Sequence, residues 1–376
     1  MSRIPSSPTT DNWSIEEAKR TYHIDRWGLS YFDIDEEGRV VARPRPDNGG
    51  ATIRLTDIID EARERNLRTP LLIRFQDILR HRVQTINAAF AKAISEYEYR
   101  GSYRGVFPIK VNQLREVVEE ILIAGEPHQT GLEVGSKPEL FAALALHKQL
   151  GSLIIFNGYK DEAYIRMALL GQKMGKSVVL VVEKMEELDP IVAVSRSMGV
   201  KPILGVRVKL WSKADGKWAA SGGENAKFGL GTAELLDLAK RLAKAELAAC
   251  FQLLHFHIGS QVPDIFTVKK AVQEASRYYA KLYKMGFPIR WFDVGGGLGV
   301  DYDGSRSKSD SSKNYSLQEY ANDVVYHVAE VSNGEGVPHP EIISESGRAI
   351  VAHHSVLVVE AFGRVTKGRT LENITY

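Results

Sequence analysis

From residue 106 onwards, hydrophobic and polar positions follow a repeating order: a short apolar run, a turn, then an amphipathic stretch. The apolar runs predict strands at residues 106–110, 131–134, 153–157, 178–182, 203–208, 252–258, 291–294 and 341–344. The amphipathic stretches predict helices at 77–98, 137–149, 161–173, 185–198, 231–247, 265–285 and 316–333. Strands that are apolar almost throughout are typical of a parallel sheet covered on both faces. Eight such repeats favour a closed (β/α)8 TIM barrel, although the count alone leaves an open doubly wound sheet as an alternative.

The segments on either side of the barrel have a different pattern. The first 14 residues are rich in Ser, Thr and Pro, whereas residues 29–43 show two apolar runs around a turn and predict a hairpin. Residues 356–365 (VLVVEAFGRV) predict a strand that leaves the barrel. We therefore expect four parts: a disordered tail at 1–20, an N-terminal segment of a β-rich second domain at 21–75, the barrel at 76–350, and the start of a C-terminal β-domain at 351–376.

Composition narrows the classes of function. The chain has 376 residues, 26% of them charged, and a net charge of +2, so no strong field favours nucleic acid or an anionic membrane as a partner. The one cysteine, Cys250, excludes an internal disulfide framework and suits a reducing compartment. No stretch approaches the roughly 18–20 apolar residues of a membrane span, and the polar N-terminus lacks a signal core. We expect a cytoplasmic protein that binds neither nucleic acid nor membrane.

Polar residues and glycines gather where the predicted strands end. In a (β/α)8 barrel the chemistry lies at the C-terminal ends of the strands. These ends carry Lys110, Glu133, Asn157, Arg207, His255, His257, Ser260, Gly295–Gly299 and Glu345–Arg348. The sequence therefore predicts a site at this rim of the barrel.

A run of glycines follows the seventh predicted strand. Glycines at 295–297 let backbone N–H groups approach an anion, and barrels often hold phosphate in the loops after strands seven and eight. A flexible turn is the alternative. After strand eight, Glu345 is followed by Gly347 and Arg348, whose guanidinium either joins the phosphate site or pairs with Glu345.

Two histidines, His255 and His257, alternate on one predicted strand and should therefore point the same way. Two histidines could suggest a metal, but no further ligand has suitable spacing, so a flat imidazole against a planar cofactor is the favoured interpretation. Which residues would bind a metal is unknown. The long loop at 209–229, rich in Gly and Ser, is either a lid or a disordered connection.

Lys110 ends the first predicted barrel strand, where an ammonium group must be paired, exposed to water or kept neutral for chemistry. Beside a phosphate site it can form a Schiff base with an aldehyde, if desolvation and nearby cations lower its pKa. A phosphate site, a lysine and a ring-stacking group together indicate pyridoxal phosphate (PLP), and Glu345 would keep the pyridine nitrogen protonated. A salt-bridged rim lysine is the alternative.

Several stretches resemble the alanine racemase/ornithine decarboxylase class of PLP-dependent barrels, fold type III. PIKVNQ (108–113) resembles the segment of the cofactor lysine, and GLEVGSKPEL (131–140) resembles the strand-two segment. HFHIGSQ (255–261), FDVGGGLGVDY (292–302) and ESGR (345–348) resemble its ring-stacking, phosphate and pyridine segments. The longer stretches SGGENAKFGL, NGYKDEAYIRMALLG and ESGRAIVAHH resemble members that decarboxylate L-arginine.

The resemblance implies a PLP-dependent lyase that converts L-arginine to agmatine and CO₂ in polyamine (spermidine) biosynthesis. It implies that Lys110 binds PLP covalently, that His257 stacks on the ring, and that Glu345 protonates the pyridine nitrogen. It places the phosphate on Ser260, Gly295, Gly296, Gly297, Gly347 and Arg348, with Glu133 near the cofactor and Arg207 near the ring hydroxyl. It also implies magnesium, for which the sequence has no motif, and a homo-oligomer in the full-length protein.

The chain departs from this class in length. Members are much longer, and their C-terminal β-domain supplies a protonating cysteine and substrate contacts; Cys250 precedes strand six, away from the rim, and cannot fill that role. We therefore expect an N-terminal portion of such an enzyme, whose activity alone is open. The alternatives are a barrel that binds PLP without turnover and a decarboxylase of lysine, ornithine or diaminopimelate. A carboxylate at 345 argues against a racemase, and the early position of Lys110 against a class I aldolase.

Overall fold

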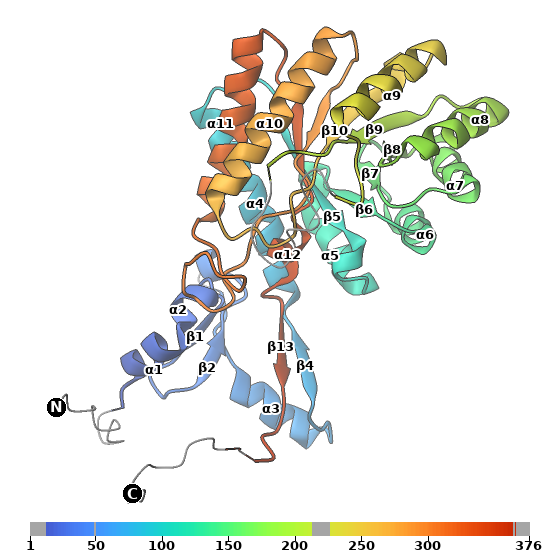
Figure 1. Cartoon of the computed structure of the whole chain (residues 1–376). Helices are drawn as coiled ribbons and strands as arrows, with labels where there is room; N and C mark the ends of the chain where they lie inside the picture. The colour runs from blue at the N-terminus through green and yellow to red at the C-terminus, as the bar shows by residue number, and fades with distance from the viewer. Residues whose placement is uncertain (1–12, 49, 213–225, 364, 366–376) are drawn as a thin grey trace, which may run out of the picture.

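A closed barrel of parallel strands forms the centre of the molecule (Figure 1). The computed structural model describes residues 13–48, 50–212, 226–363 and 365. The barrel strands are β5 (Tyr103–Pro108), β6 (Gly131–Val134), β7 (Leu153–Phe156), β8 (Ser177–Val182), β9 (Ile203–Arg207), β10 (Phe251–His255), β11 (Trp291–Asp293) and β12 (Glu341–Ser344). β12 pairs in parallel with β5 and closes the barrel. The predicted (β/α)8 barrel is confirmed.

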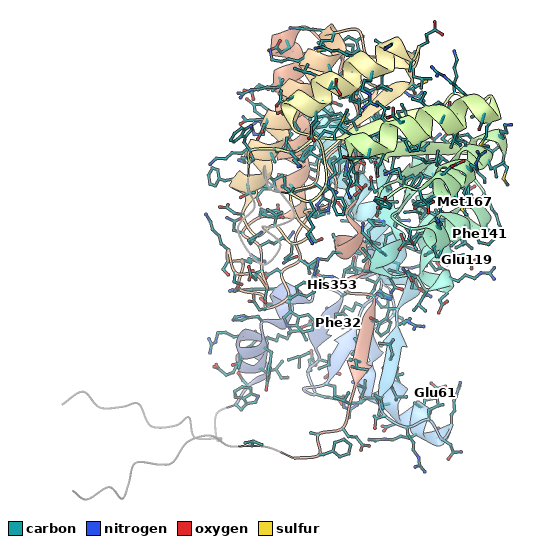
Figure 2. The ribbon with its side chains drawn as sticks, turned by 45° about the vertical axis from the view of Figure 1, so that its right-hand side comes forward. Phe32, Glu61, Glu119, Phe141, Met167 and His353 are labelled. Atoms are coloured by element: carbon teal, nitrogen blue, oxygen red, sulfur yellow. The ribbon has the colours of Figure 1, made fainter. Side chains whose placement is uncertain are left out.

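Helices surround the barrel and alternate with its strands (Figure 1). They are α4 (Gln76–Glu96), α5 (Arg115–Gly125), α6 (Lys137–Leu146), α7 (Glu162–Lys173), α8 (Leu188–Met198), α9 (Thr232–Lys244), α10 (Ile265–Lys284), α11 (Leu317–Glu335) and the short α12 (Gly347–Val351). Figure 2 shows Glu119, Phe141 and Met167 on α5, α6 and α7. Within the described ranges, none of the helices is both long and apolar enough to cross a membrane.

The strands are apolar on both faces because both faces are buried. Along β8, Val179 and Val181 face the inside of the barrel, where they pack with residues such as Leu253. The intervening Leu180 and Val182 pack in the larger cluster with the surrounding helices. This alternation explains why the strands appear in the sequence as nearly continuous apolar runs.

Two strands end two or more residues earlier than predicted, at the rim where the site lies. β5 ends at Pro108, and Lys110 lies in the short 3₁₀ helix η3 (Ile109–Val111) just beyond it. β10 ends at His255, so His257 lies in the following loop. At both places the chain leaves the barrel ladder before the predicted strand stops, and the rim residues Lys110 and His257 lie in the segments that follow.

The segment before the barrel begins with the helix α1 (Ile15–Tyr22). The predicted disordered tail is therefore wrong for residues 15–20; residues 1–12 lie outside the described part of the chain. The Ser14 side chain accepts a hydrogen bond from the Glu17 backbone N–H at 3.1 Å, and Ala18 is buried. An N-cap and one buried face are sufficient to fix this short helix.

A small sheet follows α1 and α2 (Ile24–Trp27). The predicted hairpin is confirmed as β1 (Phe32–Ile34) and β2 (Val40–Ala42), which pair antiparallel, and β3 (Ile53–Arg54) adds a third strand before α3 (Leu55–Glu64). These elements enclose a core of their own that includes Phe32.

The segments before and after the barrel meet in a second, two-stranded sheet. β4 (Leu71–Arg74) pairs antiparallel with β13 (Ser355–Val358), and this ribbon projects away from the barrel (Figure 1). His353, just before β13, has its Nε2 2.8 Å from the Trp27 carbonyl oxygen. It lies near Phe32 in Figure 2. The expected β-rich part, built from N-terminal strands and the exit strand, is therefore confirmed.

Candidate active site

A cavity of about 370 Å³ opens at the C-terminal rim of the barrel. This volume falls in the range of roughly 300–1,000 Å³ that is common for small-molecule sites. Its lining includes eight of the predicted site residues: Lys110, His257, Ser260, Gly296, Gly297, Glu345, Gly347 and Arg348. Three others, Glu133, Arg207 and Gly295, do not line the cavity. The eight lining residues thus come together from the ends of four strands, β5, β10, β11 and β12.

Lys110 points toward Glu133, a residue of β6 that is fully buried. The Lys110 Nζ lies 2.9 Å from Glu133 Oε2, while the lysine side chain is 56% exposed. Burial alone lowers the pKa of Lys110, but the carboxylates of Glu133 and Glu345 outweigh it, so the pKa is raised above its ordinary value of 10.5. The expected lowering of this pKa is therefore wrong for the ligand-free protein, because the nearest charges are carboxylates rather than cations.

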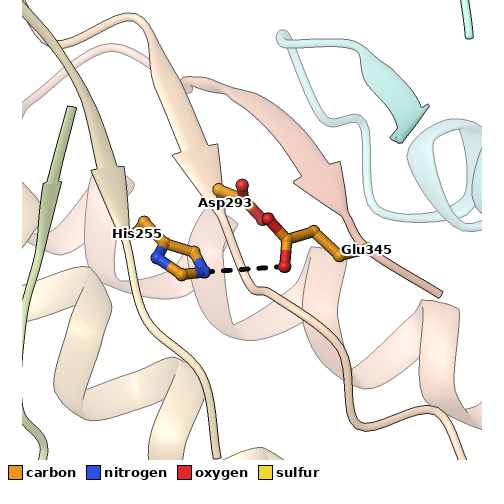
Figure 3. Close-up of side chains that lie close together, drawn as sticks. All are labelled: His255, Asp293 and Glu345. Atoms are coloured by element: carbon orange, nitrogen blue, oxygen red, sulfur yellow. Dashed lines mark ion pairs between the residues drawn. The ribbon is translucent and has the colours of Figure 1, made fainter. Parts of the chain in front are cut away.

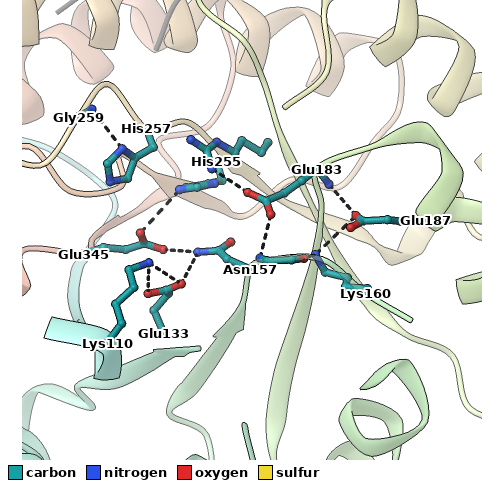
Figure 4. A network of polar contacts seen from close by, with 12 residues as sticks. Lys110, Glu133, Asn157, Lys160, Glu183, Glu187, His255, His257, Gly259 and Glu345 are labelled. Carbon is teal, nitrogen blue, oxygen red and sulfur yellow. Dashed lines mark hydrogen bonds and ion pairs between the residues drawn. The ribbon is translucent and has the colours of Figure 1, made fainter. Parts of the chain in front are cut away.

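Asn157, at the end of β7, joins this ion pair to Glu345. Its Nδ2 donates to Glu133 Oε1 at 3.1 Å and to Glu345 Oε1 at 3.0 Å (Figure 4). The sequence places Asn157 at a strand end but assigns it no role. The signal that could have identified Asn157 is its position directly after an apolar strand. Its side-chain amide also carries both hydrogen-bond donors and an acceptor.

Glu345 is buried at the base of the cavity. Burial first, and then the nearby Glu133 carboxylate, raises the pKa of Glu345 to about 7. The Glu345 backbone N–H donates to the Gly295 carbonyl oxygen at 2.7 Å, which fixes the loop after β12 to the loop after β11. The side chain that the sequence assigns to a pyridine nitrogen is therefore held in place from two sides.

The glycine loop requires glycine at two positions for distinct reasons. Gly295 has φ of +64°, and a Cβ there would lie 2.4 Å from the Phe256 carbonyl oxygen. Gly297 has φ of +112°, outside the region that side chains with a Cβ readily adopt. Between them, a Cβ on Gly296 would lie 3.0 Å from His257 Nε2. The loop is thus shaped both to turn sharply and to let the imidazole approach the backbone.

His257 lies in the cavity wall and is partly buried. Desolvation, with further effects from Arg207 and Lys110, lowers the pKa of His257 to about 3, so its ring is neutral. Its Nδ1 accepts a hydrogen bond from the Gly259 N–H at 3.1 Å. His255 is also buried, and the centroids of the His255 and His257 rings lie 6.5 Å apart. A neutral, oriented imidazole is suited to stacking on a planar ring.

Arg348 lines the cavity and does not take one of the two arrangements that the sequence suggests, the ion pair with Glu345. It forms no ion pair with Glu345 in the described part of the chain; its Nη1 donates to the Tyr302 hydroxyl at 3.0 Å. Its Nε is buried and has no hydrogen-bond partner. A cation with an unused donor at the edge of the cavity is available to an anionic ligand. Tyr302 was not predicted; it lies at the end of the FDVGGGLGVDY stretch.

Arg207 is engaged by a carboxylate that the sequence analysis missed. Its Nη1 lies 2.7 Å from Glu183 Oε1, directly after β8, and Glu183 Oε2 accepts from the Gly158 N–H at 2.8 Å. Deeper in the same network, Lys160 Nζ lies 3.5 Å from Glu187 Oε2 (Figure 4). The polar network therefore extends across the barrel mouth from Lys110 to Glu187.

Two other expectations concern residues away from the cavity. Most of the loop at 209–229 lies outside the described residues, which omit 213–225. Cys250 is buried directly before β10, at the opposite end of that strand from the cavity.

Comparison with known proteins gives consistent matches. Residues 83–352 match the family described as pyridoxal-dependent decarboxylase, pyridoxal binding domain. The chain is 51% identical over 363 residues to the biosynthetic arginine decarboxylase of Rhodopirellula baltica, covering 96% of this chain and 54% of that protein. It is 49% identical to the one of Bacteroides thetaiotaomicron, covering 94% and 56%.

A solved structure agrees with these sequence matches. The crystal structure of the biosynthetic arginine decarboxylase from Campylobacter jejuni superposes with a TM-score of 0.80 at 35% identity, covering 89% of this chain and 53% of that chain. The chain thus spans about half the length of the curated relatives it matches.

Proposed function

The chain belongs to the pyridoxal-dependent decarboxylase family, and from this premise we propose that it forms the cofactor-binding barrel of an enzyme that converts L-arginine to agmatine and CO₂. The substrate comes from the relatives, which are named biosynthetic arginine decarboxylases. The observation that carries the proposal is the cavity in which Lys110, Glu345 and Arg348 converge. The same relatives do not favour a PLP-binding barrel without turnover or a decarboxylase of another basic amino acid.

The residues present fit pyridoxal phosphate. Lys110 supplies an amine for the aldehyde of PLP, and Glu345 supplies a buried carboxylate for its ring nitrogen. Both residues line the same cavity. Among the described residues the Arg348 Nε has no hydrogen-bond partner, and Gly296 exposes its backbone to the cavity. Both features suit the binding of the PLP phosphate. His257 supplies a flat neutral ring that can stack on the pyridine ring. The fit rests on unsatisfied polar atoms and on the space that glycine leaves, not on overall shape.

When bound, PLP supplies the electron sink that takes up the electron pair left by the departing CO₂. The roles of the protein follow from its geometry. Lys110 provides the primary amine, which must first lose a proton because its pKa is raised. Glu133, 2.9 Å away, holds the Lys110 ammonium in place through an ion pair. Asn157 holds Glu133 and Glu345 at fixed positions.

The remaining groups orient and shield the reacting atoms. Glu345, in a buried and water-poor site, can hold a proton at a ring nitrogen more firmly than it could in water. Arg348 and Ser260 lie where a phosphate can be bound. Arg207 is already paired with Glu183, so we assign it an electrostatic effect on the site rather than direct contact with the ring hydroxyl.

Other expectations extend the proposal. We propose that residues 21–75 and 351–376 belong to a second, β-rich domain beside the barrel at 76–350. We propose that the whole enzyme is a cytoplasmic homo-oligomer of polyamine biosynthesis. The proposal that the enzyme uses magnesium rests on the resemblance alone.

The test uses this chain and its Lys110→Ala variant. After incubation with PLP and reduction with borohydride, mass spectrometry of peptides should show a covalent adduct on Lys110 in the wild-type chain and none on the corresponding peptide of the variant. Release of labelled CO₂ is then measured with L-arginine, L-lysine and L-ornithine. An adduct placed on a different lysine would refute the cofactor assignment, and release from lysine or ornithine but not arginine would refute the substrate.

A further inference from the structure

Three side chains meet beneath the cavity, at the centre of the barrel mouth (Figure 3). They are His255 at the end of β10, Asp293 at the end of β11 and Glu345 after β12, and one polar atom of each lies within 4.8 Å of the others. Asp293 is fully buried and Glu345 is 5% exposed. Two carboxyl groups are therefore adjacent in a site that excludes water.

The charges around them are already balanced. Lys110 is paired with Glu133 at 2.9 Å, and Arg207 is paired with Glu183 at 2.7 Å. His255 Nε2 lies 3.8 Å from Glu345 Oε2. Burial, with a further effect from Arg207, holds the pKa of His255 well below its usual range, so the imidazole is neutral and does not compensate the two acids.

Within the described residues, no lysine or arginine forms an ion pair with Asp293 or Glu345. Two adjacent buried carboxyl groups without a counter-charge do not both ionise, because the repulsion is strong where water is excluded. One proton is therefore retained between them.

The hydrogen bonds indicate which acid keeps the proton. Glu345 Oε1 accepts from the Asn157 amide at 3.0 Å, and Glu345 faces the cavity. Asp293 Oδ1 accepts from the Gly295 N–H at 2.8 Å, while its Oδ2 is buried and accepts no hydrogen bond from the described part of the chain. An oxygen without a donor is where a proton is needed most. Burial and the Glu345 carboxyl raise the pKa of Asp293 well above its usual range, in agreement with this assignment.

We propose that Asp293 is a positioning residue: it keeps a proton on Oδ2 and donates it in a hydrogen bond to Glu345, so that Glu345 faces the cavity as a single oriented carboxylate. The proposal rests on the proposed function, in which that carboxylate meets the pyridine nitrogen, and it adds a second acid behind the first. No covalent step is involved, since the proton stays on Asp293 Oδ2. The titratable and charged groups that face the pair are Tyr103, Lys110, Glu133, Arg207, His255, His257 and Tyr320.

The first test is infrared difference spectroscopy on the ligand-free chain at pH 8, above the pKa of Glu345. The wild-type chain should show the C=O stretch of a buried protonated carboxyl group. Labelling aspartate with ¹³C at the side-chain carboxyl should shift this band, and labelling glutamate should not. The band should be absent from Asp293→Asn. No band in the wild-type chain, or a band that shifts only with labelled glutamate, would overturn the proposal even if a variant fails to fold.

The second test measures the affinity for PLP. Asparagine keeps a donor at position 293, so Asp293→Asn should bind PLP with nearly wild-type affinity, whereas Asp293→Ala should bind it about 10–100-fold more weakly, since a hydrogen bond to a charged group is lost. Equal weakening in both variants would overturn the proposal. The two proposals fail separately. An infrared band on Asp293 without a Lys110 adduct would refute only the cofactor, and an adduct without the band would refute only the shared proton.

Discussion

Replacing Glu133 by glutamine should make Lys110 more reactive toward PLP. The change removes the carboxylate 2.9 Å from the Lys110 ammonium while keeping the size of the side chain. Coulomb's law at that separation gives about 6 kcal/mol at an effective dielectric constant of about 20, and about 1.4 kcal/mol in water. Because Lys110 is 56% exposed, the value near the water limit applies after screening. The pKa of Lys110 should therefore fall, and each 1.4 kcal/mol of lost attraction favours the neutral amine about tenfold.

The assay follows covalent attachment of PLP to the ligand-free chain at pH 8, from the absorption band of lysine-bound cofactor. The rate is proportional to the neutral fraction of Lys110, which rises tenfold for each lowering of the pKa by one. Glu133→Gln should therefore react about 10–100-fold faster than the wild-type chain. Glu119→Gln on α5 is the matched control, because Glu119 pairs with Arg115 away from the cavity and its loss should leave the rate unchanged.

The reasoning would be refuted by an unchanged or lower rate in a Glu133→Gln chain whose circular dichroism matches the wild type. A lower rate would show that accepting the proton from Lys110 matters more than the pKa that Glu133 imposes on it. An equal gain in Glu119→Gln would show a general effect of surface charge.

Three further changes test other parts of the site. In the ligand-free chain, the pKa of Glu345 is raised from 4.5 to about 7, so the proton it binds stabilises the fold below about pH 4.5, and about 3 kcal/mol of that stability is lost as the pH rises to about 7. Urea unfolding across this range should show the loss in the wild-type chain and much less of it in Glu345→Gln; parallel curves would contradict the assignment. Arg348→Met should weaken binding of PLP by about 10–100-fold and leave that of pyridoxal, which lacks the phosphate, unchanged; calorimetry with both ligands decides. Gly295→Ala should lower the unfolding free energy by at least about 1–3 kcal/mol, because its Cβ meets a carbonyl oxygen at positive φ. Gly334→Ala in α11, where a Cβ meets nothing within 4 Å, should be neutral or stabilising.

The fold could be predicted because each element carries its own signal. β6 and β12 begin and end where the apolar runs do, and most helices start within one or two residues of their predicted start. A strand buried on both faces and a helix buried on one leave patterns that depend only on near neighbours in sequence. Where the pattern failed, at residues 15–20, a serine cap and one buried alanine outweighed a polar composition.

The candidate site was predictable in its members but not in its electrostatics. Lys110, Gly296 and Glu345 are found at strand ends by counting repeats, because parallel strands in a barrel end at one rim. The sequence does not show that Asn157 bonds to Glu345, 188 residues away.

The pKa of Lys110 shows what the sequence alone determined and what the tertiary structure decided. The sequence placed this lysine at the reactive rim of a barrel. The structure determined that carboxylates from other strands surround it, so its pKa is raised rather than lowered. A pKa depends on distances between charges and on the exclusion of water, and both are set only when strands remote in the sequence close into the barrel.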